Sequence, residues 1–126
     1  DLPPEALAAE MASAGIYALP ARYEPFGLSV LEAALSGCAL VLGDIASLRE
    51  IWGPAALYVA PDDHPALQAT LARLIAQPAL RTRLARAALV RAQHFTPARQ
   101  CDGYLAAYAQ LQPRFAAAPA EEPACA

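Results

Sequence analysis

Residues 23–32 read Tyr23-Glu24-Pro25-Phe26-Gly27-Leu28-Ser29-Val30-Leu31-Glu32, and this stretch decides the predicted fold. Proline and glycine punctuate a turn in its first half, and the apolar residues that follow have the mixed three and four spacing of a buried helix. Glu24 is expected just before the helix N-terminus, and Glu32 about two turns along. The free N–H groups and the positive dipole end of such a helix can bind phosphate. Two carboxylates nearby, each able to accept from a pair of hydroxyls, predict a pocket for a nucleotide sugar.

The flanking sequence predicts an α/β fold of about three parallel strands with helices on both faces. Short, continuously apolar strands are expected at 15–20, 39–42 and 56–59, alternating with helices at 5–14, 27–37 and 47–52. Three further helices are expected at 65–76, 78–94 and 96–111. From Pro113 onward no periodicity remains, which predicts a disordered tail over 113–126.

Composition narrows the class of protein. The chain has 126 residues, the size of one ordinary domain, and a formal net charge of −3 with no lysine. This acidic balance argues against a general nucleic-acid binder. Cys38, Cys101 and Cys125 have no C-x-x-C spacing, so neither a disulfide framework nor a zinc site is expected. No apolar run reaches the roughly 18 residues of a spanning helix, and we expect a soluble, cytoplasmic protein.

The run from Leu19 to Ala34 closely resembles the E-x7-E signature of retaining glycosyltransferases of family 4, also called group 1. The resemblance continues through 37–44, Glu50 and 56–63 and covers roughly residues 3–112. It implies the GT-B fold, in which two Rossmann-like domains flank the active site. The part that resembles this chain, residues 1–112, is the end of the C-terminal, donor-binding domain.

The resemblance also implies roles for single residues. Glu24, the expected catalytic residue, would contact hydroxyls of the donor sugar, and Glu32 the ribose of the nucleotide. The main-chain N–H groups from Phe26 to Ser29, which include Gly27 and Leu28, would hold the sugar and the diphosphate. No metal or other cofactor is implied. Many relatives carry serine where Ala21 stands and a Gly-Gly pair in place of Ala46-Ser47.

We therefore expect the chain to be the donor-binding part of an enzyme. That enzyme would move a sugar from a nucleoside-diphosphate sugar to an acceptor hydroxyl and retain the anomeric configuration. The acceptor could be a saccharide, a lipid-linked saccharide or a small molecule. Three strands, where doubly wound sheets usually carry five or six, predict that a missing N-terminal part of the enzyme precedes Asp1. Without that partner we expect the chain to be inactive, and in the intact enzyme it could lie peripheral to a membrane.

Other interpretations of the same residues stay open. Two glutamates at this spacing also occur by chance, and Glu24 beside Arg22 could form a surface ion pair of little energetic value. Arg81, Arg83, Arg86 and Arg91 are expected to form a solvated helix face, and no ligand role is expected for His64 or His94. The competing functions are a nucleotide-sugar binding module that acts with a partner chain, a structural role with a vestigial pocket, and a fragment of a GT-B sugar-nucleotide epimerase.

Overall fold

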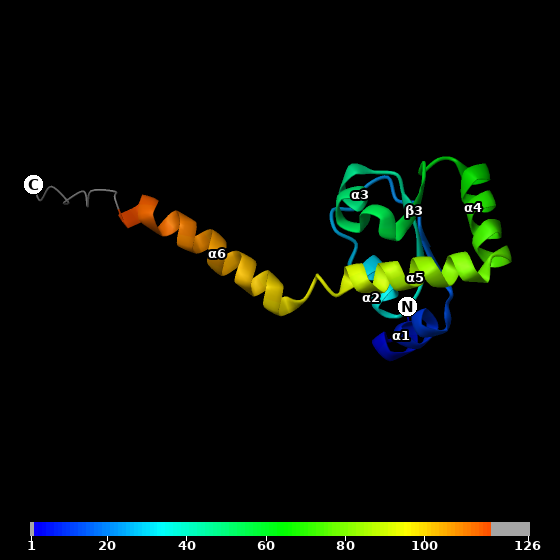
Figure 1. The fold of residues 1–126 in the computed structure, drawn as a ribbon, viewed down its shortest axis with the longest axis horizontal. Coiled ribbons are helices and arrows are strands. Elements are labelled where there is room, and N and C mark those ends of the chain that lie inside the picture. The colour runs from blue at the N-terminus through cyan, green and yellow to red at the C-terminus, as the bar shows by residue number, and fades with distance from the viewer. Residues whose placement is uncertain (1, 117–126) are drawn as a thin grey trace, which may run out of the picture. The chain divides into compact units, whose positions relative to one another are not determined.

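The computed structural model describes residues 2–116, which fall into two compact units divided between His94 and Phe95. The first unit contains a three-stranded sheet and the helices around it (Figure 1). Its elements in chain order are α1 (Pro4–Ser13), β1 (Ile16–Leu19), α2 (Leu28–Leu35), β2 (Ala39–Gly43), α3 (Ala46–Trp52), a short 3-10 helix (Gly53–Ala55), β3 (Ala56–Val59), α4 (His64–Ala76) and α5 (Pro78–Ala92). The expected strands and helices are therefore present, with ends displaced by one or two residues.

The sheet is parallel and has the order β1-β2-β3. Ile16 pairs with Ala39 at the start of β1, and Gly43 pairs with Val59 at the end of β3. Every residue of β2 is buried, as expected for the central strand of a sheet covered on both faces. This confirms the predicted α/β class with three parallel strands.

Alternate residues of β2 point into two separate cores. Leu40 and Leu42 pack in a cluster with α1, α2, α3 and the later part of α5, and this cluster contains Trp52, the largest fully buried side chain. Ala39 and Val41 pack on the other face with Leu74 of α4 and Leu84 of α5. The two-residue period of a strand thus divides one apolar run between two layers of helices.

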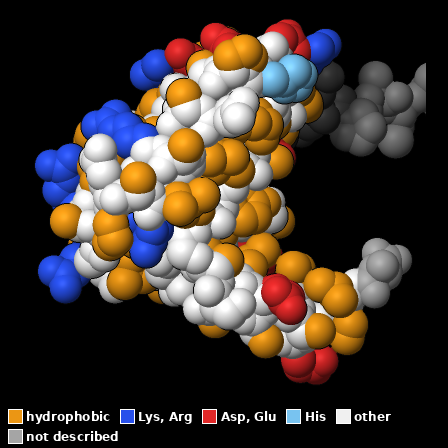
Figure 2. Space-filling model, turned by 90° about the vertical axis from the view of Figure 1, so that its right-hand side faces the viewer, with side chains coloured by type: hydrophobic (Ala, Val, Ile, Leu, Met, Phe, Trp, Pro, Cys, Tyr) orange, Lys and Arg blue, Asp and Glu red, His pale blue; other side chains and the backbone are white. Residues whose placement is uncertain are grey.

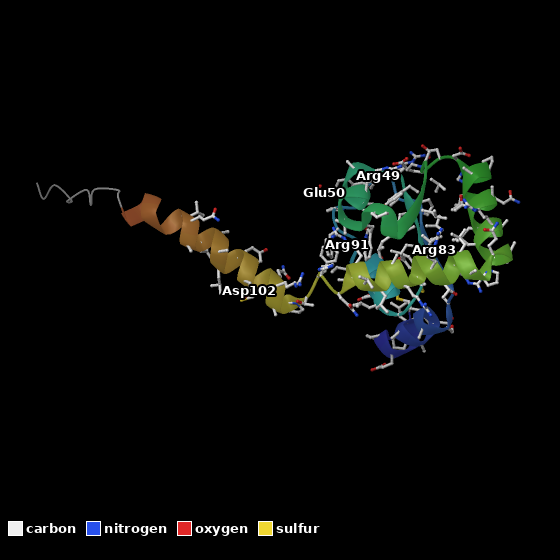
Figure 3. The ribbon with its side chains drawn as sticks, viewed as in Figure 1. Arg49, Glu50, Arg83, Arg91 and Asp102 are labelled. Carbon is white, nitrogen blue, oxygen red and sulfur yellow. The ribbon has the colours of Figure 1, made fainter. Side chains whose placement is uncertain are left out.

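Two arginines of α5 join helices rather than facing only solvent. Arg81 donates to the carbonyls of Leu74 and Ile75 at the end of α4, with Nη1 to oxygen distances of 3.0 and 3.4 Å. Arg91, labelled in Figure 3, donates through Nε to the Ile51 carbonyl near the end of α3, at 2.6 Å. Both are half-buried, so the expectation of a wholly solvated arginine face is wrong for them; Arg83 and Arg86 are exposed. The reason is that last-turn carbonyls need external donors.

The second unit contains α6, which runs from Pro97 to Ala116. Thr96 begins it as expected, because its hydroxyl accepts from the Arg99 N–H at 3.2 Å. Tyr104 and Tyr108 stack on one another with ring centroids 6.4 Å apart, and both are exposed. The helix extends beyond the expected end at Leu111, so residues 113–116 are helical, where a disordered tail was expected. Residues 117–126 of that tail lie outside the described residues.

Charge is distributed unevenly along the chain. Between His64 and Cys101 there are six arginines and no aspartate or glutamate, although acids outnumber bases in the whole sequence. Figure 2 shows several arginine side chains on one part of the face it presents, and others beside the carboxylates of the upper margin. The covering layer of α4 and α5 is therefore the basic part of an acidic protein.

Candidate functional site

The carboxyl ends of the three parallel strands lie at one edge of the sheet, and three loops leave that edge. Residues 20–27 follow β1, residues 44 and 45 follow β2, and residues 60–63 follow β3. In open parallel α/β sheets, ligands bind outside this edge. The segment with Glu24 therefore lies where the fold places ligand sites.

Glu24 closes its own loop. Its Oε1 atom accepts from the Gly27 N–H at 2.8 Å and from the Phe26 N–H at 3.4 Å. Gly27 has a φ of +81° and is the N-cap of α2, and a Cβ there would lie 2.9 Å from Val30 Cγ2. A residue other than glycine would thus be strained twice, by its backbone and by its side chain. The turn around Pro25 is consequently fixed in shape before any ligand arrives.

The N-terminus of α2 provides free donors beside this turn. The Gly27 carbonyl accepts from the Leu31 N–H at 3.0 Å, so the earlier N–H groups, from Leu28 to Val30, have no acceptor inside the helix. No side chain caps this end. Ser29 Oγ is held by the Tyr17 hydroxyl of β1 at 2.8 Å. A positive helix end with several aligned donors favours a bound anion.

Two contacts fix the loop against the rest of the edge. Ser47 of α3 donates its hydroxyl to the Glu24 carbonyl at 2.6 Å. Gly43, the last residue of β2, lies so close to the loop that an added Cβ would be 2.2 Å from the Ala21 carbonyl oxygen. Only glycine allows the loop to cross the end of β2 at this distance. Loop position is therefore set by α3 and β2, outside the motif itself.

Charged pairs flank the loop. Arg49 of α3 donates through Nη2 to Asp44 Oδ2 at 2.8 Å, and its guanidinium lies 4.5 Å from the centroid of the Tyr58 ring (Figure 3). The hydrogen bond from Arg49 holds the pKa of Asp44 below its usual value. Burial raises the pKa of Tyr58, whose hydroxyl donates to the Gly53 carbonyl at 2.8 Å. Arg22 pairs with Asp62 rather than Glu24, across two loops of the edge, and that pair is exposed.

Glu32 lies at the start of the second turn of α2, and its side chain is exposed. Its carboxylate is available to a ligand at this helix, whereas one oxygen of Glu24 is engaged by its own loop. Leu28 at the start of α2 and Tyr23 in the loop before it are 70% and 83% exposed, so apolar surface accompanies the polar groups of this segment. Among the described residues, no cluster of histidine, cysteine, aspartate or glutamate could hold a metal ion.

The sequence matches a family model over residues 1–91, and the description of that family is glycosyl transferases group 1. The chain belongs to the group 1 glycosyltransferases. The match includes the Glu24 loop, all of α2 and the three strands, so the candidate site lies within the part of the chain that defines membership.

Three curated proteins similar to this group 1 chain are a glycogen synthase and two mannosyltransferases by name. It is 44% identical over 72 residues to the glycogen synthase of Mycobacterium tuberculosis, and the aligned region covers 56% of this chain and 17% of that protein. It is 40% identical over 77 residues to the MMP alpha-(1->4)-mannosyltransferase of Mycolicibacterium hassiacum, covering 59% and 19%. It is 38% identical over 68 residues to the O-antigen chain mannosyltransferase B of Escherichia coli, covering 54% and 18%. The chain thus spans less than a fifth of the length of these relatives.

A solved structure supports the same conclusion for the fold. The sucrose-phosphate synthase of Thermosynechococcus elongatus matches with a TM-score of 0.79 and 30% sequence identity, over 94% of this chain and 30% of that structure. The group 1 chain therefore has the α/β arrangement of the C-terminal Rossmann-like portion of a GT-B protein, as the sequence predicted.

The structure places the predicted site residues of this group 1 chain in one loop and in the helix that follows it, and it adds supporting residues that were not predicted. Glu24, Phe26 and Gly27 are joined by hydrogen bonds within one turn, and Leu28 and Ser29 begin the helix that carries Glu32. The supporting residues Tyr17, Gly43 and Ser47 were not anticipated. A glycine at the end of an apolar strand was a usable signal for Gly43, because it marks close approach of another backbone. Nothing local in the sequence indicates the bond from Tyr17 to Ser29.

Proposed function

We propose that the chain is the donor-binding part of a retaining glycosyltransferase of family 4, which transfers a sugar from a nucleoside-diphosphate sugar to an acceptor hydroxyl. The single observation that carries this proposal is the juxtaposition of the uncapped α2 N-terminus with Glu24 and Glu32 at the carboxyl edge of the sheet. Its relatives, named as a glycogen synthase and two mannosyltransferases, support sugar transfer as the reaction class.

In this proposal the diphosphate lies against the N–H groups that open α2. The Phe26 and Gly27 N–H groups already donate to Glu24, so the donors left for a phosphate are those of Leu28, Ser29 and Val30. As the glycosidic bond to the leaving diphosphate breaks, negative charge grows on its oxygens. Fixed dipoles aimed at that position stabilise the charge without reorganising, which lowers the barrier. No metal is required for this step.

The two carboxylates divide the recognition of the donor. Glu32, exposed on α2, would accept from the two ribose hydroxyls. Glu24 would accept from hydroxyls of the sugar through Oε2 while Oε1 keeps the loop closed. Because Glu24 faces the sugar undergoing reaction, it acts mainly on turnover; because Glu32 faces the nucleotide, it acts mainly on affinity.

The acceptor site and the basic side chains for the leaving group would come from a partner segment, since the chain corresponds to only 17–19% of its curated relatives. We propose that the chain alone binds a nucleotide weakly and does not transfer sugar. We also propose a cytoplasmic location, where nucleotide sugars are supplied. The alternative is a nucleotide-sugar binding module that acts with a second chain. This alternative is favoured if the chain binds the nucleotide and no partner segment restores sugar transfer.

The test compares Glu24→Gln and Glu32→Gln in an active enzyme that contains this segment. Glu32→Gln should raise the donor KM by about 10- to 150-fold, since a charged hydrogen bond is worth about 1.5–3 kcal/mol, and leave kcat nearly unchanged. Glu24→Gln should lower kcat more than it weakens nucleotide binding. Glu10→Gln, an exposed carboxylate of α1, is the matched control. Equal effects on kcat and KM from both glutamates would overturn the assignment.

A further inference from the structure

A pocket lies at the amino ends of the strands, opposite the edge that carries Glu24. It has a volume of about 270 Å³ and is lined by Gly15, Gly37, Arg81, Thr82, Ala85 and Arg86, with Leu89 at its apolar side. Gly15 directly precedes β1, and Gly37 is two residues before β2, so the pocket lies between two strand entries and the middle of α5. Nothing in the proposed transfer reaction uses it.

One guanidinium in this pocket is already held in place. Arg81 Nη1 donates to the Leu74 and Ile75 carbonyls, which leaves the Nε side of the group toward Gly15. A Cβ at Gly15 would lie 3.3 Å from Arg81 Nε, so the glycine keeps this side open. Because the guanidinium is fixed by the end of α4, its remaining donors need no further ordering to receive a ligand. Arginine donors in a fixed fork suit phosphate oxygens.

The other polar groups of the pocket complete a site for an anion. Thr82 adds a hydroxyl and Arg86 a second guanidinium, and both side chains are exposed. Neither side chain makes a hydrogen bond or ion pair with another residue of 2–116, so both are available to a ligand. The segment 64–101, which contributes most of the pocket lining, contains no carboxylate. In Figure 2 several arginine side chains lie on one part of the face away from acidic side chains, while others lie beside carboxylates at the upper margin.

We propose that this pocket binds a small phosphorylated ligand, with the phosphate between Arg81, Arg86 and the Thr82 hydroxyl. The volume is slightly below the roughly 300–1,000 Å³ of ordinary ligand pockets, so it suits a phosphate with a small organic part rather than a whole nucleotide sugar. Ala85 and Leu89 supply the apolar wall for that organic part. Free phosphate and a phosphate monoester share this chemistry. The proposal is independent of the donor site, because it concerns the opposite edge of the sheet.

The chain offers a matched pair of variants for the test. Arg86→Gln and Arg83→Gln remove the same charge from exposed positions on α5, but only Arg86 lines the pocket (Arg83 is labelled in Figure 3). Thr82→Val removes the hydroxyl with little change of shape. Arg81 is unsuitable as the main probe because it also caps α4.

Calorimetry of the full chain, at constant ionic strength, would use inorganic phosphate and glycerol phosphate in separate titrations. We expect saturable binding that Arg86→Gln weakens by about tenfold, the loss of one charged hydrogen bond, and that Thr82→Val weakens by less. Arg83→Gln should change the affinity by less than about twofold, as screened surface charge does. Tighter binding of glycerol phosphate than of phosphate would identify a small organic phosphate as the ligand class.

Three results would overturn the proposal. Equal weakening by Arg83→Gln and Arg86→Gln would show a diffuse basic surface without a site. Absence of saturable binding of either probe would show that the pocket holds no phosphate. Binding only to vesicles of phosphatidylserine and phosphatidylcholine, abolished equally by both variants, would show a membrane-facing surface. Circular dichroism of each variant verifies that the fold is retained.

Discussion

Replacing Gly43 by alanine tests the position of the Glu24 loop most severely. The added Cβ would lie 2.2 Å from the Ala21 carbonyl oxygen, 2.9 Å from its nitrogen and 3.1 Å from its carbonyl carbon. Ordinary contact begins near 3.4 Å in this geometry, so the gap must open by 3.4 − 2.2, about 1.2 Å. Every residue of β2 is buried between two layers of helices, which leaves the exposed loop to move.

The expected cost of Gly43→Ala is that of an overpacked site, about 1–3 kcal/mol. For a unit of this size, each kilocalorie lowers the melting temperature by about 4–8 °C. Displacement of the loop also shifts Glu24 and weakens the Ser47 hydroxyl bond to its carbonyl. Nucleotide binding should therefore fall together with stability.

Thermal unfolding followed by circular dichroism, with and without nucleoside diphosphate, measures both effects of Gly43→Ala. Gly103→Ala is the control, because a Cβ there meets nothing within 4 Å and alanine favours the helix that contains it. A Gly43→Ala protein with unchanged melting temperature and unchanged nucleotide affinity would refute the close passage of the loop over β2.

Two other outcomes follow from the structure. The hydrogen bond from Arg49 holds the pKa of Asp44 low, so Asp44 contributes stability above the usual aspartate pKa of about 3.9, and this stability is lost as the pH falls further. In urea unfolding from pH 6 to pH 3, the free energy of unfolding should therefore depend less on pH for Asp44→Asn than for wild type, with Asp62→Asn as the control. The same pH dependence in all three proteins would contradict this. Within residues 2–116, β1 pairs only with β2, and its other edge carries unpaired backbone groups. Because such an edge can pair with another chain, sedimentation velocity should show association that grows with protein concentration. A stable monomer at all concentrations would contradict the open edge.

The sequence predicted the sheet well because the signals for it are local. The apolar runs at β2 and β3 are short, continuous and bounded by glycine and proline, and the predicted β3 agrees with the structure at both ends. Helix ends were less accurate: the helix expected at 27–37 is Leu28–Leu35, because Gly27 in the left-handed conformation forms its N-cap and Gly37 lies beyond its end.

The parts that could not be predicted depend on contacts between distant segments. Arg91 was assigned to a solvated face because helical periodicity does not reveal an unfilled carbonyl 40 residues away in sequence. The Tyr17 to Ser29 and Ser47 to Glu24 bonds link different elements and have no local pattern. The two glutamates could be proposed as site residues because Pro25 and Gly27 punctuate the chain beside them, whereas the residues that support the loop become visible only in the fold.

The central claim is that the start of α2 receives the diphosphate of a nucleotide sugar, and amide NMR of the labelled chain tests it directly. On titration with a nucleoside diphosphate, we expect saturable shifts of the Leu28 and Ser29 amides, with smaller shifts at Gly43 and Ser47. The Glu32→Gln chain should need about tenfold more ligand for the same shifts. Saturable shifts at Gly15, Gly37 and Thr82 with none at Leu28 and Ser29 would place the nucleotide at the other edge of the sheet and contradict the account.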